Sequence, residues 1–205
     1  LPLNVGFLRG IKIILPENSL LHPLFSENEA ECPAVVGGNT EISQRLTDTL
    51  LKALGLAACS QGTMNNFLFG NDQFGYYETI GGGSGATSTA NGRSAVHQHM
   101  TNTRLTDLEE MESRYPVRIN KFEIRRGSGG AGKSRGGDGI IREIQFLAPL
   151  SVTFISQHRK VPPYGCMGGE NGQCGEQYFI FPDGIKEDMP GIFNKRIFFL
   201  LLNKN

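Results

Sequence analysis

The sequence predicts an α+β fold that is mainly β, with one long helix and extensive glycine-rich ordered loops. Short apolar runs that alternate with polar residues recur through the chain, which is typical of half-buried strands. Residues 40–56 contain the only clear run of apolar residues at every fourth position, which indicates a helix. Glycine contributes 27 of 205 residues and is clustered, which favours shaped loops over regular elements.

Composition limits the classes of partner. Lysine and arginine number 20 and are balanced by 20 acidic residues, so the chain has no basic surface for nucleic acid or an anionic membrane. No apolar run approaches the roughly 20 residues that a membrane-spanning helix needs. The four cysteines form no C-x-x-C pair, which indicates reduced thiols in a cytoplasmic protein. We therefore expect neither a nucleic-acid partner nor a membrane partner.

The helix predicted at residues 40–56 begins at a capping residue, Asn39 or Thr40, and ends near Gly55. Its apolar residues are spaced by four and share one face, which we expect to pack into the core: Ile42, Leu46, Leu50 and Leu54. A second, shorter helix is predicted at residues 107–114 with Thr106 as its cap.

Alternation and turn residues predict the strands. They are expected at residues 11–15, 67–69, 76–80, 117–126, 139–147, 151–156, 177–181 and 196–202.

A glycine-rich segment, Gly127–Ser134, matches the P-loop pattern G-x-x-x-x-G-K-[ST]. A P-loop follows a strand and opens a helix whose amides hold phosphate, but here residues 135–139 contain glycine and aspartate and lead into another strand. We interpret the segment as a connection between two strands. The alternative, a nucleotide-binding loop, requires a helix after Lys133.

The pair His97-Gln-His99 is the most metal-like feature. On a strand both imidazoles would face the same way and suit a divalent metal, provided that a carboxylate such as Glu78, Asp107 or Asp72 joined them. The alternative is a hydrogen-bonded pair that shapes the loop. Both interpretations stay open at this point.

Two polar stretches could bind a small ligand. In the first, Arg104 could clamp a carboxylate while Thr101 and Asn102 add neutral hydrogen-bonding groups, although the stretch could also be a self-capping turn. In the second, the amides of Asn65 and Asn66 could bind a planar amide or carboxylate, although an Asn-rich turn explains them equally well.

The order of these motifs resembles the hydantoinase B/oxoprolinase family, and most closely its ATP-dependent 5-oxoprolinase branch. The resemblance covers residues 1–184 and rests on the segments GGNTEISQRLTDTLL, SQGTMNN, YYETIGGGSGA, VHQHMTNTR, LEEMESRYPVRI, GSGGAGKSRGGDG and PPYGCMGGENGQCG. The tail, residues 185–205, departs from the family pattern. We expect residues 1–205 to be the C-terminal portion of such a chain, a single incomplete domain that is inactive alone.

The resemblance implies an ATP-dependent hydrolase that opens the lactam 5-oxo-L-proline to L-glutamate within glutathione metabolism. It implies a hydantoinase A-like partner, in an oligomer, which handles ATP and Mg²⁺. A divalent metal is possible, but metal-bearing relatives hold their ligands mainly upstream of the matched region. A hydantoinase or ketone carboxylase subunit, or a non-catalytic remnant, are the alternatives.

Site roles follow from this resemblance. We expect acid–base roles for His97, His99 and Glu78. The substrate-binding residues are expected to be Asn65, Asn66, Thr101, Asn102 and Arg104. Convergence of the glycine loops and the two histidines on one cleft would favour the enzyme over the non-catalytic remnant.

Overall fold

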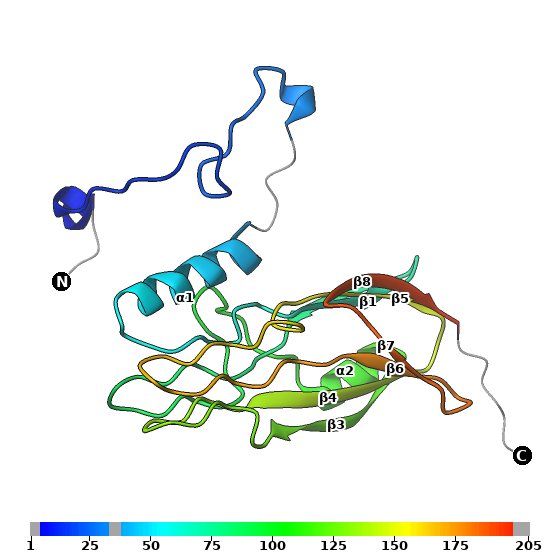
Figure 1. Cartoon of the computed structure of the whole chain (residues 1–205). Coiled ribbons are helices and arrows are strands. Elements are labelled where there is room, and N and C mark those ends of the chain that lie inside the picture. The colour runs from blue at the N-terminus through cyan, green and yellow to red at the C-terminus, as the bar shows by residue number, and fades with distance from the viewer. Residues whose placement is uncertain (1–4, 33–37, 199–205) are drawn as a thin grey trace, which may run out of the picture. The chain divides into compact units, whose positions relative to one another are not determined.

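The computed structural model describes residues 5–32 and 38–198, drawn in Figure 1. The chain divides into two compact units, residues 1–36 and residues 37–205. Unit 1 contains short 3₁₀ turns at Val5–Gly10 and Glu29–Glu31. The strand predicted at residues 11–15 is wrong. Its apolar side chains are exposed, and no strand of the described residues pairs with its backbone.

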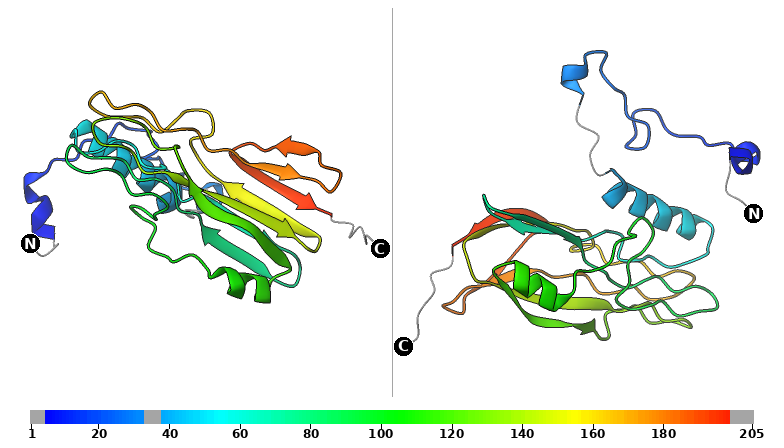
Figure 2. Two further views of the ribbon diagram at one scale, coloured as in Figure 1. Left: turned by 90° about the horizontal axis from the view of Figure 1, so that it is seen from below. Right: turned by 180° about the vertical axis from the view of Figure 1, so that it is seen from behind.

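Unit 2 is built from antiparallel pairs of strands. A four-stranded sheet has the order β2-β1-β5-β8, formed by β1 (Asn66–Gly70), β2 (Gly75–Thr79), β5 (Leu150–Ile155) and β8 (Ile192–Ile197). Two hairpins accompany it, β3 (Val117–Arg125) with β4 (Gly139–Phe146) and β6 (Tyr178–Ile180) with β7 (Lys186–Asp188). The four-stranded sheet and the β3–β4 hairpin lie as two layers at one end of the unit (Figures 1 and 2).

The core lies where these layers meet. Alternate residues of β1 and β5 point inward, so Phe69 and Val152 are both almost fully buried. Helix α2 (Leu108–Arg114) adds Met111, which is fully buried, and the β3–β4 hairpin adds Phe146. The rings of Phe69 and Phe146 meet edge to face at 5.8 Å, a favoured geometry for aromatic pairs.

The N-cap of helix α2 lies one residue later than predicted, at Asp107. The side chain of Asp107 accepts hydrogen bonds from the backbone amides of Glu109 and Glu110 at 3.0 and 3.3 Å. The Thr106 hydroxyl instead donates to the Tyr76 hydroxyl oxygen at 2.8 Å, because the single Tyr76 proton goes to the Glu78 carboxylate. The cap predicted at Thr106 is therefore wrong, because Asp107 reaches the free amides.

Helix α1 (Gln44–Ala53) follows a π-helical turn, Asn39–Ser43, and is shorter than the predicted residues 40–56. Its burial is the reverse of the expected one. Gln44 and Asp48 are 1% and 3% exposed, whereas Leu50 and Leu54 are 54% and 69% exposed. The helix places its polar face on the loops, where hydrogen bonds satisfy it, so the prediction that its leucines pack into the core is wrong.

The mixed α and β class is confirmed, and the strands predicted from residue 67 to residue 181 lie close to β1–β6. The short strand β7 was not predicted, since Lys186–Asp188 is entirely charged. The last strand, β8, ends at Ile197 rather than extending through residues 196–202, and residues 199–202 lie outside the described part. Within the described residues, no helix is long and apolar enough to cross a bilayer.

Candidate functional site

The glycine-rich loops converge on one large cavity of about 1270 Å³. Segments 81–88, 128–137 and 163–177 contribute to its wall, together with side chains of β4 and β5. Figure 1 shows these loops extending from the sheet end of unit 2 beneath α1. His97 lines a separate hollow of about 390 Å³ instead, so the glycine loops share a cavity but His97 faces another.

The loops pack backbone against backbone, which explains their composition. A Cβ atom on Gly83 would lie 2.0 Å from the Gly137 carbonyl oxygen, and one on Gly130 would lie 2.2 Å from the Glu170 carbonyl oxygen. Hydrogen bonds tie the same loops together, for example from the Gly137 amide to the Ser84 carbonyl oxygen at 2.9 Å. Larger residues at these positions would force the loops apart.

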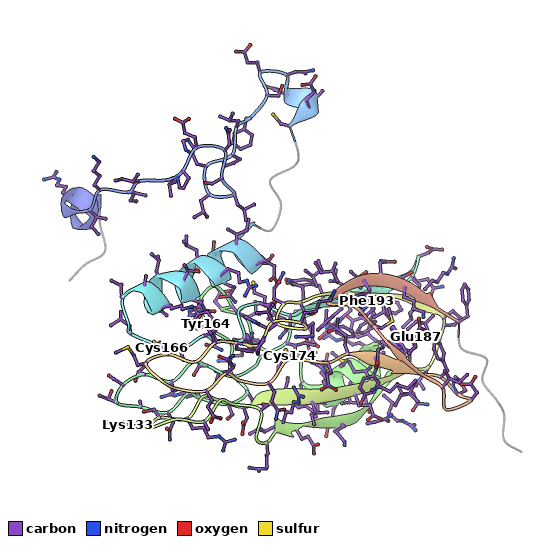
Figure 3. The ribbon with its side chains drawn as sticks, viewed as in Figure 1. Lys133, Tyr164, Cys166, Cys174, Glu187 and Phe193 are labelled. Carbon is purple, nitrogen blue, oxygen red and sulfur yellow. The ribbon has the colours of Figure 1, made fainter. Side chains whose placement is uncertain are left out.

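The P-loop-like segment joins β3 to β4, which are antiparallel, and no helix follows it. Lys133 lies at the end of unit 2 away from the sheets (Figure 3). Asp138 holds the segment by accepting hydrogen bonds from the Gly129 amide at 2.8 Å and from Arg135 Nη2 at 3.0 Å. The segment therefore has the form expected for a connection between strands.

A polar cluster, centred on the buried Asp48, lies between α1 and the cavity wall. We name it the Asp48 cluster, and it comprises Arg45, Asp48, Cys59, Ser60, His99 and His158. One Asp48 oxygen, Oδ1, accepts hydrogen bonds from His99 Nε2 at 3.0 Å and from the Ser60 amide at 3.2 Å. The other, Oδ2, accepts one from the Ser60 hydroxyl at 2.8 Å.

Asp48 is ionised at neutral pH. Burial alone raises the pKa of Asp48, but hydrogen bonds from His99 and then from Ser60 outweigh it and lower this pKa below its ordinary value. Because a carboxylate can only accept, the His99 Nε2 atom carries a proton. Tyr164 lies beneath α1 in Figure 3 and donates its hydroxyl to the Asp48 carbonyl oxygen at 2.8 Å, which anchors the helix over the cluster.

Cys59 and His158 lie side by side without forming an activated pair. His158 Nδ1 donates to the Val161 carbonyl oxygen at 2.8 Å, so Nε2 is left to accept from Arg45 Nη1 at 2.9 Å. Burial lowers the pKa of His158, which favours this neutral form. Burial and the nearby charge of Asp48 raise the pKa of Cys59 to about 12. Cys59 is therefore a thiol and not a nucleophilic thiolate.

We predict that native Cys59 resists alkylation. At pH 8 a pKa of about 12 leaves a thiolate fraction roughly 10³-fold below that of an ordinary cysteine, so iodoacetamide should label Cys59 only after unfolding. Peptide mass spectrometry of native and guanidinium-unfolded protein measures this. The partly exposed Cys166 and Cys174 are the internal controls, and equal native labelling of Cys59 and Cys166 would contradict the prediction.

Two residues with expected acid–base roles are held by other partners. Glu78 forms an ion pair with Arg142, in which both side chains are 4% exposed, and accepts a hydrogen bond from the Tyr76 hydroxyl at 2.7 Å. The two ring nitrogens of His97 lie 2.6 Å from the Thr103 carbonyl oxygen and 3.1 Å from the Thr79 carbonyl oxygen. Both side chains thus have structural partners.

The two histidines do not share a face. His99 has a φ of 51°, so the chain turns there instead of continuing as a strand. His97 faces backbone carbonyl groups, whereas His99 faces Asp48. Within residues 5–32 and 38–198, no group of three or more His, Cys, Asp or Glu side chains could hold a metal ion. His97 and His99 therefore do not fit the shared metal site that a strand would have allowed.

The asparagines predicted to bind substrate have different surroundings. Asn65 lines the large cavity and donates to the Ile80 carbonyl oxygen at 3.2 Å, with its Oδ1 atom 3.4 Å from Arg159 Nη2. Asn66 is buried and accepts a hydrogen bond from the Tyr77 hydroxyl. Of these two, Asn65 is the one placed to meet a ligand in the cavity.

The other predicted binding residues lie elsewhere. Thr101 is buried and accepts a hydrogen bond from Gln44 Nε2 at 3.1 Å, next to the Asp48 cluster. Asn102 is exposed, and Arg104 is exposed at the separate hollow that contains His97. Arg104 and Asn65 thus line different hollows.

Sequence reasoning did not single out Asp48, His158 or Arg159. Asp48 lies opposite the leucines of α1 and looks like a solvent-facing residue in the sequence pattern. His158 and Arg159 lie in the polar segment that follows β5, after Ser156 and Gln157, and a polar segment at the end of a buried strand is the one signal that could have indicated them.

The chain belongs to the Hydantoinase B/oxoprolinase family, which it matches over residues 1–197. It is 53% identical over 175 residues to the 5-oxoprolinase of Dictyostelium discoideum, covering 85% of this chain and 13% of that protein. It is 51% identical to 5-oxoprolinase 1 of Arabidopsis thaliana, covering 89% of this chain and 14% of that protein. The chain thus spans about one seventh of the length of these relatives.

More distant similarities agree with this membership. A protein of a Pseudomonas species that is named as a D-/L-hydantoinase subunit is 34% identical over 183 residues, covering 85% of this chain and 30% of that protein. The crystal structure of an ATP-dependent caprolactamase from Pseudomonas jessenii superposes with a TM-score of 0.55 at 23% identity, covering 69% of this chain and 27% of that one. At 23% identity, the similarity to the caprolactamase shows a shared fold alone.

Proposed function

We propose that this chain forms part of an ATP-dependent cyclic-amide hydrolase that opens 5-oxo-L-proline to L-glutamate. The observation that carries the proposal is the sequence identity of 53% and 51% to two 5-oxoprolinases, over 85% and 89% of this chain. The large cavity and the Asp48 cluster beside it support it, because they supply space for a small substrate and groups that can move a proton.

The chemistry requires activation of a poor electrophile. Transfer of a phosphoryl group from ATP to the lactam carbonyl oxygen makes that carbon open to attack by water. The ring C–N bond then breaks, the nitrogen takes up a proton, and hydrolysis of the phosphate bond completes the reaction. The net reaction consumes one ATP and two waters and yields glutamate, ADP and phosphate.

In this proposal, Ser60 and Asp48 move the proton of the attacking water. Ser60 lines the cavity, and its hydroxyl donates to Asp48 and accepts from the Gly62 amide at 3.0 Å, which leaves one acceptor position for a water. His99 holds the Asp48 carboxylate from the other side. The proton passes from the water to Ser60 while the Ser60 proton passes to Asp48.

We assign ATP and Mg²⁺ to a hydantoinase A-like partner. The G-x-x-x-x-G-K-S segment of this chain opens no helix, so it lacks the row of free amides that holds phosphate in a P-loop. The caprolactamase from Pseudomonas jessenii, whose crystal structure has a similar fold, is also described as ATP-dependent, and its name indicates a lactam substrate.

A chimaeric enzyme tests the proposal. The 175-residue segment of the Dictyostelium 5-oxoprolinase that aligns with this chain is replaced by the corresponding residues of this chain. We expect release of glutamate from 5-oxoproline that depends on ATP, measured by a coupled glutamate assay. A folded chimaera that releases none, alongside an active parent enzyme, would refute the proposal. Opening of hydantoin in place of 5-oxoproline would favour the hydantoinase alternative.

A further inference from the structure

Arg159 is a cation of the cavity wall without an ionic partner. Three arginines line the cavity in the described part of the chain. Arg142 pairs with Glu78, and Arg125 pairs with Glu176 at 3.2 Å. Arg159 forms no ion pair with any described residue, although it lines the same cavity.

The partners of Arg159 are all neutral. Its Nε atom donates to Gln177 Oε1 at 2.8 Å, and Nη1 donates to the Gln157 carbonyl oxygen at 2.7 Å. Its Nη2 atom lies 3.4 Å from Asn65 Oδ1. A guanidinium group carries five N–H donors, so two remain after these three contacts.

The surroundings hold the guanidinium group in one orientation. Its Cζ atom lies 5.6 Å from the centre of the Phe154 ring. Gly175 packs directly against the group, since a Cβ atom there would lie 2.2 Å from Nη1. A fixed guanidinium group with free donors is pre-organised to bind a ligand with two oxygen atoms.

The charge of Arg159 is not compensated nearby. Burial, followed by the like charge of Arg125, lowers the pKa of Arg159 to about 10, so the group is still charged at neutral pH. Glu41 attracts it only from beyond ion-pair distance. A partly buried charge without an ionic partner is unfavourable, and an anion in the cavity would reduce this cost.

We propose that Arg159 binds the carboxylate of the lactam substrate in the large cavity, with Asn65 beside it. The identity of the lactam rests on the proposed function, whereas the carboxylate class rests on the geometry of Arg159. Ser60 lines the same cavity, so a substrate held at Arg159 shares its space with the proposed proton relay. Arg104, the residue that the sequence indicated for this task, faces the other hollow.

Binding to the full 205-residue chain tests this assignment. NMR titrations compare L-5-oxoproline, 2-pyrrolidinone, which is the same ring without the carboxylate, and inorganic phosphate. We expect 5-oxoproline to bind about 10- to 100-fold more tightly than 2-pyrrolidinone, and Arg159→Gln to abolish that difference. Arg118→Gln is the matched control, because Arg118 is exposed on β3, and it should bind like the wild type.

A second variant does not remove the cation. Gln177→Glu places a carboxylate where an amide oxygen now lies 2.8 Å from Arg159 Nε, so the charge gains an internal partner of nearly the same shape. We expect this variant to lose affinity for 5-oxoproline while circular dichroism shows an intact fold. Wild-type affinity in Gln177→Glu or in Arg159→Gln would overturn the proposal.

The remaining outcomes also decide the question. Preference for phosphate over 5-oxoproline, or no binding of 5-oxoproline by the wild-type chain, would overturn the carboxylate assignment. In the chimaeric enzyme, Arg159→Gln should raise KM about 10- to 100-fold and change kcat little. If the Arg159→Gln chimaera turns over 5-oxoproline with an unchanged KM, only the inference about Arg159 is refuted. If the 205-residue chain binds 5-oxoproline through Arg159 but the chimaera shows no turnover, only the proposed function is refuted.

Discussion

Replacing Arg142 with methionine is expected to destabilise unit 2 by about 3–5 kcal/mol, because the change leaves Glu78 as an unpaired charge in the core. Both side chains are 4% exposed, and Arg142 Nη2 also lies 3.4 Å from Met111 Sδ in the centre of the core. Methionine replaces most of the aliphatic length of arginine, so the loss reports mainly the stranded carboxylate rather than a large cavity. Urea unfolding followed by circular dichroism measures the free energy of unfolding.

The stability lost in Arg142→Met is also expected to depend on pH. Burial raises the pKa of Glu78, while Arg142 and then the Tyr76 hydroxyl act in the opposite direction. A carboxyl group whose folded pKa is raised stabilises the fold below its unfolded pKa and loses that contribution as pH rises through the folded pKa. Removal of Arg142 raises the pKa of Glu78 further, so the variant should lose more stability than the wild type as the pH rises above about 4.5.

The control for Arg142→Met is Arg118→Met, an exposed position on the neighbouring strand β3, where we expect a change within about 0.5 kcal/mol. The double variant Glu78→Gln with Arg142→Met should recover part of the loss, because no charge then stays buried. Equal unfolding energies for Arg142→Met and the wild type would show that the pair contributes nothing to the fold.

Asp48→Asn is expected to reduce turnover of the chimaeric enzyme by about 10²–10⁴-fold, the usual contribution of a positioned acid–base group. Asparagine has the shape of aspartate, but it cannot take a proton from Ser60. Its amide nitrogen is a donor, so it would face one of the donors, Ser60 or His99, that now bind the carboxylate. The coupled glutamate assay at saturating 5-oxoproline and ATP measures kcat. KM should change little, since Asp48 does not line the cavity.

Asp72→Asn is the matched control for Asp48→Asn, because Asp72 is exposed in the turn between β1 and β2 and should leave turnover unchanged. The melting temperature of each variant shows whether the fold survives. A folded Asp48→Asn enzyme with wild-type kcat would exclude Asp48 from proton transfer. Loss of activity in both variants would point to a general effect of the substitutions.

The strands were largely predictable because alternation is a local signal. In β3, for example, apolar and polar residues alternate along the sequence except at Asn120-Lys121, where the pairing with β4 also shifts register. The helix face was not predictable in this way. The leucine spacing of α1 correctly indicates a helix, but which face is buried depends on what lies beneath it, and that is the set of loops around Tyr164.

The site was harder to predict than the fold. Arg45 and His158 are 113 residues apart in the chain and meet at 2.9 Å, and no spacing rule joins them. His97 and His99 are two residues apart and yet face different partners, because the positive φ at His99 turns the chain. Residues that are neighbours in the sequence thus face different partners, whereas residues far apart in the sequence come into contact.

Sequence alone established the family and the mixed class of helices and strands, since each depends on local composition or on the order of motifs along the chain. Only the tertiary structure decided which polar groups meet, because burial and charge pairing are properties of contacts between distant segments. It gave carboxylate partners to Arg142 and Arg125, and it left Arg159 with neutral ones.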